Sequence, residues 1–122
     1  AATDPRRMID ALAAGGATRL VLVPSLLRAL LDAAPDLGRR LPALRYWSCS
    51  GEPLDHALAE RFRAAAPDAT LYNVYGTSEF WDVSWHATRS DDPGAHGVPF
   101  GETIPGMRVH VLDRWLREVP VG

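Results

Sequence analysis

The amino-acid sequence predicts an α/β fold in which a parallel sheet is flanked by helices. Three short apolar runs, at residues 18–23, 44–49 and 71–75, have the length and composition of buried strands. Segments with the apolar spacing of amphipathic helices lie between these runs, and the connections are short. The order strand, helix, strand, helix, strand favours parallel strands joined by right-handed crossovers.

The first helix precedes the first strand. We expect it to begin after Thr3 or Asp4, because both side chains are good helix caps and Pro5 suits a first helical turn. Gly15 and Gly16 are expected to stop it.

The remaining elements follow in order. A second helix is expected over residues 25–34, with its first residue, a serine, as the cap, and a third over residues 54–66. Residues 81–88 are compatible with a further strand, although their alternation is less clean. Residues 89–97 predict a surface loop, and residues 107–112 a last strand.

Composition narrows the function classes. The 122 residues carry a net charge of −2, which argues against nucleic-acid or membrane-surface partners, since both favour a basic excess. All 13 basic residues are Arg, so this chain supplies no catalytic or phosphate-binding Lys. A single cysteine, Cys49, permits no intrachain disulfide, and we expect it to be a buried structural thiol. No apolar run approaches the roughly 20 residues that span a bilayer, and no signal peptide opens the chain, so a cytoplasmic location is expected.

The end of the third strand concentrates groups that suit a nucleotide and its metal. Tyr75 offers a ring face, Gly76 permits close backbone approach, Thr77 and Ser78 carry hydroxyls, and Glu79 carries a carboxylate. Rings stack on bases, hydroxyls donate to phosphate oxygens and carboxylates bind Mg²⁺. A strand followed by an ordinary polar turn explains the same residues.

Three loops leave the carboxyl ends of the predicted strands. They are Pro24-Ser25, Ser50-Gly51-Glu52-Pro53 and Gly76-Thr77-Ser78-Glu79. Ligands of such sheets bind outside these strand ends. We therefore expect the second and third loops to converge on one crevice.

Four segments of the chain, in order, resemble motifs of adenylate-forming enzymes, which include nonribosomal peptide synthetase adenylation domains and acyl-CoA synthetases. Asn73-Val74-Tyr75-Gly76-Thr77-Ser78-Glu79 is similar to the family signature Asn-x-Tyr-Gly-(Pro/Thr/Ser)-(Thr/Ser)-Glu. The other matching segments are residues 21–27, 44–54 and 98–113. The resemblance covers nearly the whole chain.

The resemblance implies specific roles in joining a carboxylate to ATP. Tyr75 would stack on adenine and Asn73 would bond the base edge, with Gly76 and Thr77 in the same nucleotide loop. Ser78 would contact the α-phosphate and Glu79 would hold Mg²⁺, which makes these two the expected catalytic residues. The alternatives are a core aromatic for Tyr75 and a surface carboxylate for Glu79.

The resemblance also places Gly51-Glu52-Pro53 against the adenosine. A helix start explains these residues equally well, because Pro suits the first turn and Glu complements the helix dipole. By the same resemblance, positions of the acyl pocket fall on Leu22, Ser48, Ser50, Val74, Asp82 and Val83. The alignment of the last two, which follow Glu79, could slip by one.

These implications make residues 1–122 a single fragment, the central α/β subdomain of the large N-terminal domain of an adenylate-forming enzyme. The family's phosphate loop would lie upstream and its small C-terminal domain downstream. The implied function is ATP-dependent activation of an amino acid, with Mg²⁺, followed by transfer to phosphopantetheine on a carrier protein domain or to CoA. An acyl-CoA or aryl-acid ligase, or a catalytically silent scaffold of the same fold, stays open. The fragment alone is expected to form no acyl-adenylate.

Overall fold

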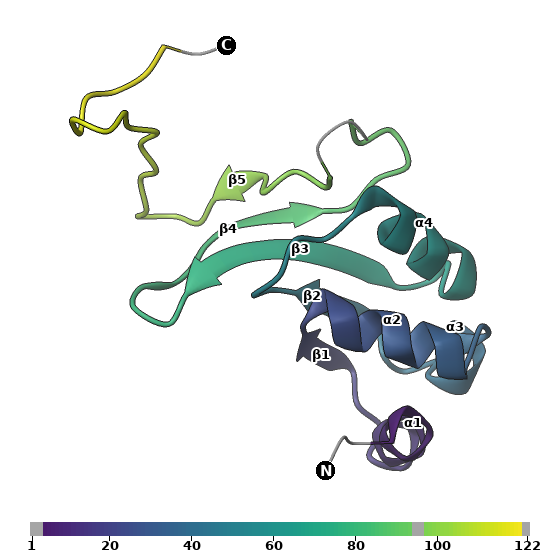
Figure 1. Cartoon of the computed structure of the whole chain (residues 1–122). Coiled ribbons are helices and arrows are strands. Elements are labelled where there is room, and N and C mark those ends of the chain that lie inside the picture. Colours follow the sequence, from purple (N-terminus) through teal and green to yellow (C-terminus); the bar gives the residue numbers. More distant parts are fainter. Residues whose placement is uncertain (1–3, 94–96, 121–122) are drawn as a thin grey trace.

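The computed structural model describes residues 4–93 and 97–120 and confirms the α/β class (Figure 1). In chain order the elements are α1 (Pro5–Ala14), β1 (Arg19–Leu22), α2 (Pro24–Ala33), α3 (Leu37–Arg40), β2 (Tyr46–Cys49), α4 (His56–Ala65), β3 (Thr70–Thr77), β4 (Trp81–Ala87) and β5 (Glu102–Thr103). The strands form one five-stranded sheet in the order β1-β2-β3-β4-β5.

The sheet is mixed. β1, β2 and β3 are parallel, as predicted, with Leu22, Cys49 and Asn73 side by side, so their carboxyl ends lie at one edge. β4 runs antiparallel to β3, and β5 antiparallel to β4. Only residues 78–80 join β3 to β4, which is far too short for a parallel crossover.

The core lies between the sheet and the helices that connect its parallel strands (Figure 1). Trp47 on β2 and Phe62 on α4 meet edge to face with ring centroids 5.4 Å apart, and the Trp47 indole donates to the Leu44 carbonyl. The other large, fully buried side chains are mostly leucines from the helices and strands, namely Leu27, Leu30, Leu31, Leu37, Leu44, Leu58 and Leu71, with Ile9. None of the helices in the described part of the chain has the length and apolar character needed to cross a membrane.

The helix boundaries depend on caps that the sequence located only in part. Asp4 caps α1 by accepting a hydrogen bond from its first turn, while Thr3 lies outside the described residues. The prediction that Ser25 caps α2 is wrong, because the helix begins one residue earlier and Val23 holds the cap position. α4 begins two residues later than expected because the Asp55 side chain caps it.

Beyond β3, residues 81–87 form the further strand that the sequence allowed. Residues 89–93, the start of the predicted surface loop, form no helix or strand, and residues 94–96 lie outside the described residues. α3 and β5 were not predicted, since four and two residues are too few to show a hydrophobic period.

The predicted strand at residues 107–112 is wrong. Within the described residues its backbone joins no sheet and makes only an isolated bridge, from Leu112 to Glu118. The chain instead turns back on itself around Asp113, whose carboxylate accepts from the amides of Trp115 and Arg117. This C-terminal segment extends away from the sheet (Figure 1).

The thiol of Cys49 is buried at the end of β2, as expected, and we predict that it resists alkylation. Burial, reinforced by the charge of Glu52, raises the pKa of Cys49 to about 12. Because the pKa of the thiol is higher in the folded than in the unfolded protein, the protonated thiol favours the folded state. This contribution to the free energy of unfolding is fully present below about pH 9 and is lost as the pH rises toward 12. Iodoacetamide at pH 8, followed by peptide mass mapping, should label Cys49 only after denaturation; prompt labelling of the folded protein would contradict this.

Candidate functional site

The second and third strand-end loops meet in one pocket of about 720 Å³, as the sequence predicted. We call it the strand-end pocket. Its lining residues are Ser50 and Gly51 from the β2–α4 loop, and Gly76, Thr77, Ser78, Glu79, Trp81 and Asp82 from the β3–β4 hairpin. The described side chains in it are hydroxyls, two carboxylates and one indole, with no cation among them.

The first loop joins this arrangement through Glu52. The Glu52 carboxylate accepts from the Ser25 amide and from the Ser25 hydroxyl, both at 2.9 Å. These bonds fix the β2–α4 loop to the start of α2. The alternative that Gly51-Glu52-Pro53 forms the start of a helix is wrong, because Asp55 caps α4 and the helix begins only at His56. The contact of this loop with adenosine stays a prediction.

Gly76 is required by a close approach of backbones inside the hairpin. A Cβ atom at Gly76 would lie 2.1 Å from the Trp81 carbonyl oxygen and 2.7 Å from the Asp82 Cα. The pairing of β3 with β4 is irregular at this point, and Trp81 adopts a positive φ of 58°. The expected reason for this glycine was the approach of a phosphate; the structure adds the approach of β4.

Glu79 lies at the tip of the hairpin with its carboxylate open to solvent. Its amide donates to the Thr77 hydroxyl at 3.3 Å. Hydrogen bonding with the Thr77 side chain and with the backbone at Glu79 holds the pKa of Glu79 below its usual value, so the group is ionised at neutral pH. Among the described residues no cluster of three or more potential metal ligands is assembled. One free carboxylate nevertheless fits Mg²⁺ that is shared with substrate phosphates, which often has only one or two protein carboxylates.

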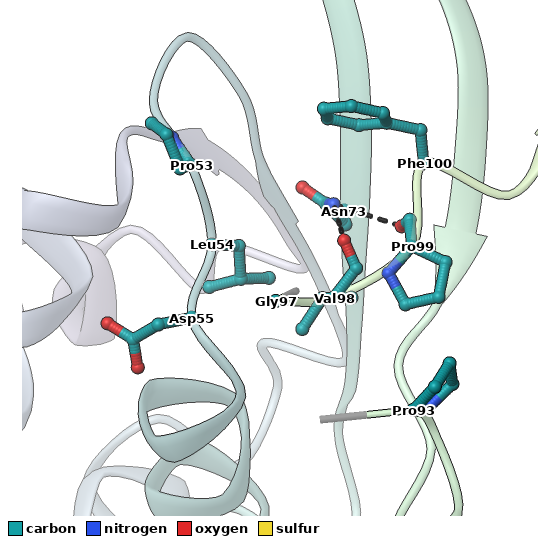
Figure 2. Close-up of a pocket in the computed structure, with 9 residues that line it drawn as sticks. All are labelled: Pro53, Leu54, Asp55, Asn73, Pro93, Gly97, Val98, Pro99 and Phe100. Atoms are coloured by element: carbon teal, nitrogen blue, oxygen red, sulfur yellow. Dashed lines mark hydrogen bonds between the residues drawn. The ribbon is translucent and has the colours of Figure 1, made fainter. Parts of the chain in front are cut away.

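Asn73 lies two residues before Tyr75 on β3 and borders a second pocket of about 470 Å³, here called the Asn73 pocket (Figure 2). Only 2% of Asn73 is exposed. Its amide nitrogen donates to the carbonyls of Val98 at 3.1 Å and Pro99 at 3.0 Å. Figure 2 shows its Oδ1 turned away from both carbonyls, and over residues 4–93 and 97–120 it accepts no hydrogen bond. Among the described residues, the amide oxygen of Asn73 is therefore left as an acceptor for a ligand.

Tyr75 separates the two pockets along β3, since Asn73 lines one and Gly76 the other. It is 40% exposed, so the core-aromatic interpretation is wrong. One side of its ring packs on Phe100, with ring centroids 4.7 Å apart and planes inclined by 43°. Phe100 was not predicted as a site residue; its place between Pro99 and Gly101 in a matching segment was the available signal.

The residues expected to form the acyl pocket do not all lie on the same side of the sheet. Ser50 and Asp82 line the strand-end pocket. Ser48 and Val74 point to the sheet face away from the helices, because they alternate with the buried Cys49 and Asn73. Leu22 is in register with Cys49 and lies in the core, and Val83 is also buried. Val21, 73% exposed and in register with Ser48, has the side-chain direction that was expected of Leu22.

We predict that Asn73→Asp destabilises the protein as well as altering the site. A carboxylate donates nothing, so it would face the Val98 and Pro99 carbonyls without a bond, at a cost of about 2–3 kcal/mol in the free energy of unfolding. Denaturant unfolding of the full-length polypeptide measures this. Ser84→Ala is the control, since it removes an equally buried hydroxyl outside this contact. An equal loss in both variants would contradict the assigned role of Asn73.

The chain is similar in sequence and in fold to known proteins. The model of the AMP-binding enzyme family matches residues 1–122. The chain is 37% identical over 123 residues to phosphinothricin tripeptide synthetase PhsB of Streptomyces viridochromogenes, covering 98% of this chain and 10% of that protein. It is 36% identical to the beta-alanyl-bioamine nonribosomal peptide synthetase ebony of Drosophila melanogaster, again over 98% of this chain but 15% of that protein. The solved structure of PA1221, a peptide synthetase protein containing adenylation and PCP domains, superposes with a TM-score of 0.82 at 28% identity, covering 98% of this chain and 24% of that one. The chain thus spans a small part of each relative.

Proposed function

The chain belongs to the AMP-binding enzyme family, and from this we propose that it is the central α/β subdomain of an adenylation domain that activates an amino acid with ATP. The rest of the polypeptide would supply the phosphate loop and the small C-terminal domain. Two named relatives are peptide synthetases, which favours an amino acid over other carboxylic acids as substrate.

The observation that carries this proposal is that two pockets border β3, one at Asn73 and the other at residues 76–79. Asn73 offers a hydrogen-bond acceptor in one pocket, and the hydroxyls of Thr77 and Ser78 and the Glu79 carboxylate border the other. Tyr75 lies between them. A nucleotide could place its base at Asn73 and Tyr75 while its phosphates reach residues 77–79, with the 50–53 loop bordering both pockets.

In the proposed reaction a substrate carboxylate oxygen attacks the α-phosphorus of ATP. The new oxygen–phosphorus bond forms as the bond between the α- and β-phosphates breaks, and pyrophosphate leaves. Bound Mg²⁺ would offset phosphate charge, and Glu79 is the residue placed to hold it. Ser78 donates to the α-phosphate, and Tyr75 with Asn73 orients the nucleotide, so that the reacting atoms are held in line.

Acceptor and partner follow from the same proposal. After activation the acyl group would pass to the thiol of phosphopantetheine on a carrier protein domain, as the adenylation and PCP domains of PA1221 suggest by analogy. Transfer to CoA is the alternative acceptor. Asp82 and Ser50 at the strand-end pocket are the proposed contacts to the acid, together with Ser48 and Val74 on the exposed sheet face.

ATP–pyrophosphate exchange by the full-length polypeptide, across a panel of amino, aryl and fatty acids, tests the proposed function. Exchange with amino acids supports it. Exchange only with aryl or fatty acids favours an acyl-CoA or aryl-acid ligase. No exchange with any acid, from folded protein, favours a silent scaffold of the same fold.

A further inference from the structure

His86 and Asp92 form a partly buried pair that the proposed reaction does not use. The His86 Nε2 and the Asp92 Oδ1 are 2.7 Å apart, and only 21% and 5% of the two side chains are exposed. The other oxygen of Asp92 accepts from the Arg89 amide at 2.8 Å. Burial acts to raise the pKa of Asp92, but the hydrogen bonds from Arg89 and His86 outweigh it and hold that pKa below its usual value. An ionised carboxylate only accepts, so the proton lies on Nε2 of His86.

His86 is the direct neighbour of Asn73 across the β3–β4 pair. Opposite residues of an antiparallel pair place their side chains on the same sheet face. The His86 side chain therefore lies on the face where the amide of Asn73 contacts Val98 and Pro99.

Described residues on either side of those two carbonyls contact His86. On one side Asp92 binds the ring, and the next residue, Pro93, lines the Asn73 pocket. On the other side Gly101 passes so close to β4 that a Cβ there would lie 2.6 Å from the His86 Cβ. Between these points residues 98–100 hold Asn73 and contact Tyr75.

We infer that His86, through its bond to Asp92, is a positioning residue that fixes residues 98–100 and thereby directs the Asn73 Oδ1 into the pocket as an acceptor. This rests on the proposed function, in which the pocket receives the base of ATP. A fixed acceptor bonds the 6-amino group of adenine and repels the 6-oxo group of hypoxanthine. When the segment is released, the Asn73 amide can rotate and present its NH₂ group instead, so the discrimination is lost.

Calorimetric titration of the full-length polypeptide with ATP and with ITP tests the inference without knowledge of the acid. Wild-type protein should prefer ATP. His86→Ala should reduce the ratio of the two affinities roughly tenfold, the value of one hydrogen bond of ordinary strength. His86→Gln should restore most of the preference, because its amide can donate to Asp92.

His110→Ala is the matched control, since His110 also bonds a carboxylate, that of Glu118 at 2.6 Å, but on the exposed C-terminal segment. Asp92→Ala removes the acceptor from the other side of the pair and serves where His86→Ala gives no folded protein. An unchanged ratio in folded His86→Ala or Asp92→Ala overturns the inference while the proposed function stands. Wild-type protein that binds neither nucleotide overturns both.

Discussion

Gly76→Ala in the full-length polypeptide is expected to lower the free energy of unfolding by about 3 kcal/mol and to remove exchange activity, since overpacking against backbone is relieved only by displacing it. The added Cβ would lie 2.1 Å from the Trp81 carbonyl oxygen, so the two strands of the hairpin must separate. That movement displaces Ser78 and Glu79 from the strand-end pocket. Denaturant unfolding and ATP–pyrophosphate exchange measure the two effects.

Gly16→Ala is the matched control. Gly16 has a positive φ of 59°, but a Cβ there meets nothing within 4 Å. Only the backbone preference is violated, at a cost of roughly 1–2 kcal/mol, and activity should persist. Retained exchange in Gly76→Ala would show that the hairpin does not need the close approach.

Glu79→Gln is expected to slow exchange by about 10²–10³-fold with every acid tested, the usual effect of losing one preorganised charge or donor. The carboxylate is exposed and ionised, and the amide that replaces it would bind Mg²⁺ far more weakly. Excess Mg²⁺ should partly restore the rate, which loss of folding would not allow.

Asp82→Ala, three residues away in the same pocket, is expected to change the ranking of acids while ATP use stays largely intact. The two variants are compared by kinetic profiles over one substrate panel. If Glu79→Gln reorders the panel without slowing it, or Asp82→Ala slows every acid alike, the placement of these two carboxylates is wrong.

Residue pattern was sufficient to predict the parallel half of the sheet and the meeting of two loops at its edge. Leu71 and the residues around Trp47 belong to apolar runs with the length and composition of buried strands, and Gly76 lies one residue before the end of β3. These signals are local. Because right-handed crossovers join parallel strands, the carboxyl ends of these strands are expected at one shared edge of the sheet.

The remaining features depend on contacts between residues far apart in the chain. Ser25 seemed a cap from its neighbours, but its hydroxyl bonds Glu52, 27 residues away. The bonds of Asn73 to residues 98 and 99 likewise have no local signature. The error at residues 107–112 has another cause, because a strand pattern indicates propensity and not whether a neighbouring strand is present.

A crystal structure of the full-length polypeptide with ATP and Mg²⁺ tests the central claim most directly, namely that the two pockets along β3 form the nucleotide site. We expect adenine against the Tyr75 ring with its 6-amino group at the Asn73 Oδ1, and the α-phosphate beside Ser78 with Mg²⁺ at Glu79. Nucleotide bound elsewhere, with Asn73, Tyr75 and Glu79 uncovered, would contradict it.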